Sequence, residues 1–555
     1  MTQRRSNTSQ RRRRGTIALA ARTRRQGVAL LVVAIAVAAC ATDPAGVEVE
    51  SVASIVDDVS EVDGSTPDVD EGSVVTEPDA APSPPSGVEQ EEGEEDDPQT
   101  PPGTGPAAGE GEPGATTLGD PYVGDFGNGG YDVVEYDLEL DWDPDAEVLN
   151  GTAVITATAT EGLSSFNLEL TGFDVDQVTV DNAVADVDRK DDEMTIIPSA
   201  ALAAGTEFVT TVRYSGTPQS NPFVAGVVGA PSGWQTRDGF AYVVGEPLSA
   251  TTFHPANDHP SDKASFVYRI TAPSELIVAA NGTLESSEEQ AGSTTWTFRQ
   301  PAPQTTYLTT ILIGDFVVVD DEPSASGVPV RNVFDASLAE RVEPLFEDQP
   351  AMIDAFEELF GPYPFDVYGS AVVADSFGGA LETQTLSIFG VDVLGFGSPE
   401  DIVAHELAHQ WFGNNVSLDR WEDIWLNEGF ATYAEALWQE ASDPDFEYQD
   451  WIRDLTRFGP GLERRVHDPG PTELFGVQVY LRGGLTLHAL RVEVGDEVFF
   501  DILKTWNVRF AGANAVTDDF QDLAEELSGV ELDDFFDEWL RSTELPAELD
   551  GVPLR

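Results

Sequence analysis

The segment "HELAHQWFGNNVSLDRWEDIWLNEGFATY" (His405–Tyr433) decides how the second half of this 555-residue chain folds and acts. His405 and His409 are four residues apart, so on an α-helix they project from the same face, one turn from each other. Ser398-Pro399-Glu400 supplies an N-cap residue, a first-turn proline and a first-turn acid, which predicts a helix that begins here. Two imidazoles on one helix face can share one cation.

Glu406 completes an H-E-x-x-H motif, in which the glutamate acts as a base toward a metal-activated water. A catalytic zinc needs three protein ligands and one open position. Glu428 opens a second helical stretch, with 18 residues between it and His409, which leaves room for a loop and a returning helix. We therefore predict one Zn²⁺ per chain on His405, His409 and Glu428. The alternative is a helix with two incidental surface histidines.

The combination H-E-L-A-H, 18 residues, N-E-G-F-A resembles the signature of the M1 (gluzincin) zinc aminopeptidases, of the aminopeptidase N type. The resemblance implies an α+β multidomain protein, with an N-terminal antiparallel β-sheet domain followed by a thermolysin-like mixed α/β zinc domain. Many relatives continue into a further β-sandwich and a helical C-terminal domain. This chain looks like a short form that lacks the helical domain, and we expect a more open cleft.

Residues Gly379-Ala380-Leu381-Glu382-Thr383 resemble the G-A-M-E-N motif of the same family. In the family, the glutamate of that motif binds the free α-amino group of the substrate, and the backbone lines the peptide. The resemblance gives these roles to Glu382 and to the backbone of Gly379 and Ala380. Leu381 conserves the volume of methionine, whereas Thr383 in place of asparagine would loosen the loop or shift peptide binding.

Two further matches extend the resemblance. "VYLRGG" resembles the Y-x-K-G segment of the family, which implies that Tyr480 donates a hydrogen bond to the tetrahedral intermediate, with Arg482 in place of lysine. "VVGEPLSATTFHPANDHPSDKASF" resembles a loop of the β domain that reaches the cleft, which makes Glu246 a second acid near the substrate amine. Val244 stands where many relatives have glutamine.

Other polar residues near these motifs receive weaker interpretations. Asp423, in "WEDIW", either orients a ligand histidine or is a plain surface acid. The remaining histidines lack a partner pattern, and we expect structural roles for all of them: His254, His259, His467 and His488.

The coarse pattern divides the rest of the chain. From 119 to 322, apolar and polar residues alternate with period two, as in "YDVVEYDLELDW", which predicts the β domain as a sandwich or a curved sheet. From 323 to 555 the pattern is helical, interrupted by the strand-like "YGSAVVADSFGGALETQTLSIFG", which predicts the zinc domain.

The N-terminal region predicts export. A basic stretch without acids is followed by an apolar run that ends in "VAAC", and this ending resembles the lipobox of bacterial lipoproteins. We expect residues 1–40 to be a signal peptide and Cys40, the only cysteine, to carry a lipid that anchors the protein outside the cytoplasm of a bacterium, at the envelope or cell surface. The alternative is a short membrane anchor with an incidental cysteine. Residues 41–118, rich in Pro, Gly, Ser and acids, predict a disordered tether.

The charge balance narrows the partners. The chain has 29 basic and 100 acidic residues, a net charge of −71, which argues against nucleic acid because phosphate contacts need clustered Lys and Arg. Such acidity suits a salty medium, and a negative cleft also attracts metal ions and protonated amines.

These observations predict a zinc aminopeptidase that hydrolyses the N-terminal bond of extracytoplasmic peptides with a free N-terminus. The alternative is a zinc endopeptidase or another gluzincin hydrolase, acting on epoxides or esters, in an open cleft. A third possibility is a non-catalytic surface protein, but the intact set of Glu406, three ligands and Tyr480 argues against it. No motif indicates the oligomeric state or the preferred first side chain.

Overall fold

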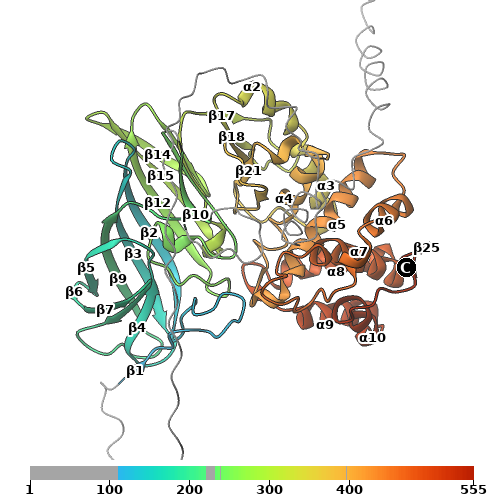
Figure 1. The fold of residues 1–555 in the computed structure, drawn as a ribbon, viewed down its shortest axis with the longest axis horizontal. Coiled ribbons are helices and arrows are strands. Elements are labelled where there is room, and N and C mark those ends of the chain that lie inside the picture. Colours follow the sequence, from blue (N-terminus) through green and yellow to red (C-terminus); the bar gives the residue numbers. More distant parts are fainter. Residues whose placement is uncertain (1–110, 221–231, 238, 396) are drawn as a thin grey trace, which may run out of the picture. The chain divides into compact units, whose positions relative to one another are not determined.

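The computed structural model describes residues 111–220, 232–237, 239–395 and 397–555. Strands fill the chain up to residue 320 and helices dominate after residue 339 (Figure 1). The predicted α+β class is confirmed, with an N-terminal β-sheet domain followed by a mixed α/β domain. The predicted signal peptide, Cys40 and most of the predicted tether lie outside the described residues.

An eight-stranded sheet forms the centre of the β domain, in the order β14-β15-β12-β2-β3-β9-β5-β6. Its long strands are β2 (Tyr131–Asp143), β3 (Val148–Ala159), β9 (Glu207–Gly216), β12 (Ala264–Pro273) and β15 (Ser293–Gln304), and its shorter ones are β5 (Asp174–Val180), β6 (Ala183–Val184) and β14 (Thr283–Gln290). Most neighbouring strands of this sheet are antiparallel, as expected, but β12 pairs with β2 in parallel. The chain returns to the free side of β2 only after it has formed β3, β5, β6 and β9, so a long crossover and not a hairpin joins β2 to β12.

Period-two alternation puts one face of β2 in the core, and a bulge shifts the phase. Tyr131 and Val133 are buried, and then Tyr136, Leu138 and Leu140 are buried, so the inward set changes from odd to even numbers. The register with β3 shifts between Val133 and Glu135. One extra residue in a bulged strand turns all later side chains to the opposite face.

Two four-stranded sheets complete the β domain. The first, in the order β1-β4-β8-β7, contains β1 (Glu112–Pro113), β4 (Leu163–Glu169), β8 (Glu193–Ile197) and β7 (Asp186–Lys190). The second, in the order β10-β11-β16-β13, contains β10 (Gly233–Arg237), β11 (Phe240–Val244), β16 (Ile311–Gly314) and β13 (Ile277–Ala280). Side chains from all three sheets share one hydrophobic cluster, so the sheets pack face to face as the sequence pattern predicted.

The β domain begins earlier than predicted. Residues 111–118 were expected to belong to the disordered tether, yet β1 pairs with β4 and the Glu112 N–H donates to the Gly162 carbonyl at 3.0 Å. Gly, Pro and Glu make up half of this segment, GEPGATTL, so composition alone predicts disorder. Backbone pairing to an existing sheet edge holds them instead.

The domain boundary at residue 322 also needs correction. β17 (Phe316–Asp320) pairs antiparallel with β18 (Arg331–Asp335) and forms the edge of the catalytic sheet, whose order is β17-β18-β19-β21-β20. The other strands are β19 (Ser370–Val373), β20 (Ala380–Leu381) and β21 (Ser387–Gly390). The polar turn after β17 resembles a linker in sequence, but it is the loop of a hairpin, so the second domain begins before it.

Helices surround this sheet and carry the H-E-L-A-H, N-E-G-F-A and VYLRGG motifs of the second half. They are α2 (Ala339–Val342), α3 (Gln349–Phe360), α4 (Pro399–Ala408), α5 (Trp425–Ser442), α6 (Tyr448–Thr456), α7 (Val477–Val494), α8 (Asp496–Arg509), α9 (Thr517–Ser528) and α10 (Asp533–Phe536). Among the described residues, every helix is too short or too polar to cross a lipid bilayer.

Helix α4 begins where the sequence predicted. Ser398 has extended backbone geometry and Pro399 is the first helical residue. The Ser398 carbonyl accepts the Asp401 N–H at 3.1 Å, although the Ser398 side chain makes no capping hydrogen bond. The helix ends at Ala408, and His409 follows with helical backbone angles, so the spacing of one turn between His405 and His409 is preserved.

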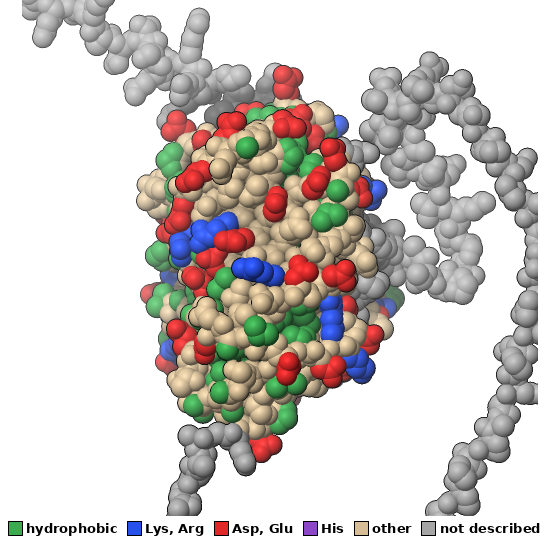
Figure 2. Space-filling model, turned by 90° about the vertical axis from the view of Figure 1, so that its left-hand side faces the viewer, with side chains coloured by type: hydrophobic (Ala, Val, Ile, Leu, Met, Phe, Trp, Pro, Cys, Tyr) green, Lys and Arg blue, Asp and Glu red, His purple; other side chains and the backbone are tan. Residues whose placement is uncertain are grey.

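The surface of the sheet-rich side is acidic, in agreement with the net charge. Figure 2 shows many Asp and Glu side chains on this face and fewer Lys and Arg side chains. The acids are spread over the face and interleaved with polar residues, which is the pattern of a solvated surface.

Helices α5 and α7 approach each other through two glycines. A Cβ atom on Gly483 would lie 2.8 Å from the Gly429 Cα, and one on Gly429 would lie 2.9 Å from the Gly483 Cα. Both distances are shorter than any ordinary carbon contact, so neither position tolerates a side chain without separation of the two helices. Glycine inside a helix costs about 1 kcal/mol relative to alanine, and close packing here offsets that cost.

Replacement of Gly483 by alanine is therefore expected to lower the free energy of unfolding by about 1–3 kcal/mol through overpacking, measured by denaturant unfolding. Gly484→Ala is the matched control, because its Cβ would lie 3.2 Å from the Thr432 methyl group and 3.6 Å from the Gly429 carbonyl oxygen, both longer than the contact at Gly483. The control should be neutral or stabilising by up to about 1 kcal/mol, since alanine favours the helix. Equal stability of the two variants would show that the glycine contact does not constrain the helices.

Candidate active site

Three side chains from two helices converge at the centre of the second domain. His405 and His409 come from the end of α4, and Glu428 comes from the first turn of α5. The His405 Nε2 lies 3.2 Å and the His409 Nε2 3.5 Å from one oxygen of Glu428, and the three side chains are buried. The structure thus brings together the three predicted metal ligands.

These distances suit a zinc ion. In a tetrahedral site with bonds of about 2.0–2.1 Å, neighbouring ligand atoms are separated by about 3.3 Å. The two distances from the histidine nitrogens to Glu428 are close to this value, and all three ligand atoms lie within 4.8 Å of one another. Two imidazole nitrogens with one carboxylate form the donor set of a catalytic zinc site. The residues present therefore fit the metal that the motif implies.

The Nδ1 atom of each ligand histidine contacts a hydrogen-bond acceptor on the side of the ring away from the metal site. The His405 Nδ1 lies 2.8 Å from a carboxylate oxygen of Glu435, and the His409 Nδ1 lies 3.1 Å from the Phe412 carbonyl. These contacts place the Nδ1 proton outward and leave both Nε2 atoms free to bind a metal.

Neither interpretation of Asp423 is correct, because this acid is buried and contacts no ligand histidine. Asp423 accepts hydrogen bonds from the backbone and hydroxyl of Thr517 and pairs with His467 at 3.3 Å, so it caps the start of α9. Glu435 takes the orienting role instead. It lies seven residues after Glu428 on α5, and two helical turns place both carboxylates on the same face. That spacing is a signal in the sequence that our interpretation missed.

The charges of the site separate the roles of its carboxylates. Burial opposes ionisation of Glu428, but His409 and His405 outweigh it and lower its pKa to about 2. Burial raises the pKa of Glu406 to about 8, against the opposing effect of both histidines. Burial also opposes the imidazolium of His405, yet hydrogen bonds to Glu428 and Glu435 raise its pKa. Glu406, which lies on the same helix as the ligand histidines, therefore takes up a proton far more readily than the metal ligand Glu428, as a general base beside the metal requires.

Tyr480 reaches the site from α7. Its ring stacks beside the His405 imidazole, with 6.2 Å between the ring centroids. Burial and the nearby carboxylates of Glu428 and Glu246 raise the pKa of its phenol well above the ordinary value. Tyr480 therefore keeps its proton and acts as a hydrogen-bond donor.

Arg482 explains how α7 is fixed. The guanidinium is fully buried and has no carboxylate partner among the described residues, and it donates instead to backbone carbonyls. Its five acceptors are the carbonyls of Leu462, Arg464, Glu538, Trp539 and Glu544. The planar fork of arginine reaches this number of acceptors, whereas lysine has three donors, so the arginine ties α7 to two neighbouring segments.

Glu382 lies beside the metal ligands on the loop that follows β20. Its backbone carbonyl accepts hydrogen bonds from Gln410 at 3.1 Å and from Asn414 at 2.7 Å, both just past α4. Thr383, the departure from the family motif, is buried and donates its hydroxyl to the Leu386 carbonyl. The threonine thus closes the loop on itself, and the loosening that its presence suggested is not found in this structure.

Glu246 approaches Glu382 from the β domain. Carboxylate oxygens of Glu246, Glu382 and Glu428 lie within 4.8 Å of one another. Burial and the neighbouring charge of Glu382 raise the pKa of Glu246 well above its ordinary value, and burial also raises the pKa of Glu382. Two such carboxylates gain free energy when a cation, such as a protonated amine, binds between them.

One pocket contains every predicted site residue: Gly379, Ala380, Glu246, Glu382, His405, Glu406, His409, Glu428 and Tyr480 all line it. Two aromatic side chains, Phe377 and Phe475, also line the pocket and were missed, because an apolar residue in a strand or helix pattern carries no sequence signal for a substrate site. Among the described residues that line the pocket there is no lysine or arginine.

The other histidines have the structural roles that were predicted. The His254 Nδ1 contacts the Pro255 carbonyl, and His259 bonds to Ser261 and Asp120. His467 pairs with Asp423, and His488 stacks on the Tyr448 ring with 4.3 Å between the ring centroids. None of the four lines the pocket.

Comparisons with known proteins agree with this site. Residues 133–308 match the Peptidase M1 N-terminal domain, and residues 345–539 match the Peptidase family M1 domain. A crystal structure of the M1 zinc metallopeptidase from Deinococcus radiodurans is 31% identical with a TM-score of 0.71, and the likeness covers 78% of this chain and 99% of that one. The same protein in complex with a Tyr-Ser-Ala substrate has a TM-score of 0.72.

Sequence relatives are longer. Aminopeptidase M1 of Arabidopsis thaliana is 28% identical over 324 residues, which cover 54% of this chain and 36% of the relative. Aminopeptidase N of Streptomyces lividans is 28% identical over 329 residues, which cover 53% of this chain and 38% of the relative. A fold and a buried His-His-Glu site of this kind define a zinc metallopeptidase. The chain belongs to peptidase family M1, and it resembles the two-domain form of that family.

Proposed function

We propose that this protein is a zinc aminopeptidase that removes the first residue from peptides with a free N-terminus. The observation that carries the proposal is the pair of buried carboxylates, Glu246 and Glu382, next to the metal ligand Glu428. A protonated α-amine brings a positive charge that offsets the repulsion within this pair, whereas an internal peptide segment has no positive charge at its backbone. The short distance to the metal ligand then leaves room for the first peptide bond only.

The residues of the chain divide the work as follows. His405, His409 and Glu428 hold the zinc, which when bound supplies a Lewis acid and lowers the pKa of a water. Glu406 takes the proton of the attacking water and passes it to the leaving amine. Tyr480 donates its phenolic hydrogen to the oxygen on which negative charge develops. Glu382 and Glu246 bind the ammonium group and set the position of the scissile bond.

The relatives support this function. The curated relatives named above are aminopeptidases, although this chain spans little more than a third of their length. A Tyr-Ser-Ala tripeptide is bound in the Deinococcus structure.

The test compares an aminoacyl anilide with its N-acetylated form, with and without a chelator. The free substrate should be cleaved at least about 100-fold faster than the blocked one, because the acetyl group removes the charge that the acids bind. Glu406→Gln should retain zinc and lose activity by about 100-fold to 10,000-fold. Equal cleavage of the free and blocked substrates would identify an endopeptidase or another hydrolase instead.

We also propose that the protein acts outside the cytoplasm, as a lipoprotein anchored through Cys40. The proposal depends on the basic N-terminus, the apolar run and the lipobox-like "VAAC". Residues 41–110 would then hold the catalytic domains away from the membrane.

Expression in a bacterial host with an alkyne-labelled fatty acid tests the anchor. The full chain should incorporate the label and sediment with membranes, and Cys40→Ala should lose the label. A label that persists in the variant, or wild-type protein without label in the soluble cytoplasmic fraction, would contradict the proposal.

A further inference from the structure

Tyr307 is a buried tyrosine of the β domain to which the proposed reaction assigns no role. It lies in the short turn η3 (Thr306–Leu308), and its side chain is 1% exposed. Its phenolic oxygen lies 3.2 Å from the side-chain nitrogen of Asn427 and 3.5 Å from a carboxylate oxygen of Glu382. Asn427 is the neighbour of the metal ligand Glu428, so the phenol bridges the metal-binding helix and the acid that we assign to the substrate amine.

The direction of these hydrogen bonds follows from the groups involved. The Asn427 side-chain nitrogen is an amide NH₂ group, which can only donate hydrogen bonds, so it donates to the phenolic oxygen of Tyr307. The phenolic hydrogen is then free to point to the carboxylate of Glu382, which accepts. A tyrosine that both accepts from α5 and donates to Glu382 fixes the distance between the two elements.

The backbone beside Tyr307 is tied to the Glu382 loop independently of the phenol. The Leu308 carbonyl accepts the Gln384 N–H at 3.0 Å. The Asn281 side-chain nitrogen donates both to that carbonyl, at 3.0 Å, and to the Gln384 carbonyl, at 2.6 Å. The turn that carries Tyr307 and the loop that carries Glu382 therefore have a fixed register.

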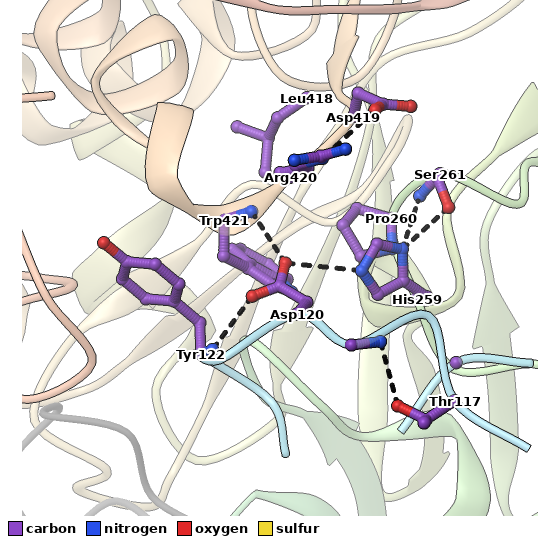
Figure 3. A network of polar contacts seen from close by, with 12 residues as sticks. Thr117, Asp120, Tyr122, His259, Pro260, Ser261, Leu418, Asp419, Arg420 and Trp421 are labelled. Atoms are coloured by element: carbon purple, nitrogen blue, oxygen red, sulfur yellow. Dashed lines mark hydrogen bonds and ion pairs between the residues drawn. The ribbon is translucent and has the colours of Figure 1, made fainter. Parts of the chain in front are cut away.

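The Tyr307 ring is also supported from the other side. It packs against the Trp421 ring, with 5.3 Å between the centroids. The Trp421 backbone N–H donates to Asp120 at 3.2 Å, and the same carboxylate group accepts from the Tyr122 N–H and contacts His259 (Figure 3). Asp120 thus holds the residue against which Tyr307 rests, at the start of the turn that leads into α5.

From these contacts we infer that Tyr307 is a positioning residue for substrate recognition: it holds the Glu382 carboxylate at a set distance from the metal ligands, so that a bound α-amine places the first peptide bond at the metal. The inference rests on the proposed aminopeptidase function. Its consequence is that the phenolic hydroxyl contributes to selectivity for free amines without contact to the reacting atoms.

The experiment uses the full zinc-loaded enzyme and the variant Tyr307→Phe, which removes only the hydroxyl. The value of kcat/KM for an aminoacyl anilide should fall by about tenfold, mainly through KM, which is the effect expected when a hydrogen bond to a charged group is lost. Kinetics on the N-acetylated anilide, or its inhibition constant where it is not cleaved, should stay within about twofold because that ligand does not use Glu382.

Two further variants separate positioning from general structure. Tyr268→Phe removes another buried hydroxyl of the same domain, one that contacts Gln304 and Thr309 away from the pocket, and it should leave both substrates unaffected. In the Glu382→Gln background, Tyr307→Phe should change kcat/KM by less than about twofold, since its effect acts through that carboxylate.

The outcomes are distinct. If wild-type enzyme cleaves free and blocked anilides equally, the proposed function fails. If wild-type enzyme is selective but Tyr307→Phe behaves as Tyr268→Phe, or keeps its full effect in the Glu382→Gln background, the positioning role of Tyr307 is wrong and the proposed function stands. Zinc content and the thermal unfolding midpoint, measured for each variant, confirm that the folded holoenzymes are being compared.

Discussion

Buried negative charge around two histidines is the constraint on which the rest of this structure depends. Burial of a carboxylate is costly unless a cation or several hydrogen bonds compensate it, and no lysine or arginine lines the described pocket. The histidines and a bound metal would compensate the charge at one end, and in the proposed function a substrate amine compensates it at the other. Metal binding and amine recognition therefore both compensate the same buried negative charge. Five glutamates carry it: Glu246, Glu382, Glu406, Glu428 and Glu435.

The fold meets this constraint by fixing each glutamate on a rigid element. Glu428 and Glu435 share one face of α5, and Glu406 lies on α4 between the two ligand histidines. The contact between Gly429 and Gly483 sets the distance from α5 to α7, which carries Tyr480. The β domain adds Glu246 directly and holds Glu382 through the phenol of Tyr307. Each carboxylate therefore keeps its place against the repulsion of the others.

The sequence predicts those parts of the site that depend on local geometry. The helical spacing of His405 and His409 and the return to Glu428 required no knowledge of the fold beyond one helix pair, and the structure confirms their convergence. The family resemblance located Glu382, Glu246 and Tyr480, and all three line the same pocket. Glu435 was equally predictable from its helical spacing to Glu428, but the sequence analysis considered only Asp423 for the orienting role.

The features that the sequence did not predict depend on contacts between distant segments. β1 is held by pairing to β4, about 50 residues later, and its composition alone indicates disorder. The β17–β18 hairpin joins the catalytic sheet across a polar loop that looks like a linker. Tyr307 bonds to residues 75 and 120 positions away, so no local pattern marks it.

The role of buried negative charge is tested most directly by the thermal unfolding midpoint of zinc-free and zinc-loaded protein near neutral pH, measured for wild type and for Glu246→Gln. The raised pKa of Glu246 means that its charge destabilises the folded state as pH rises above the unfolded value. Zinc should raise the wild-type midpoint by several degrees, and the zinc-free variant should melt above zinc-free wild type, because glutamine removes the free-energy cost of burying an ionisable carboxyl group. A zinc-free variant that melts below wild type, or a midpoint that zinc does not change, would contradict this role of buried charge.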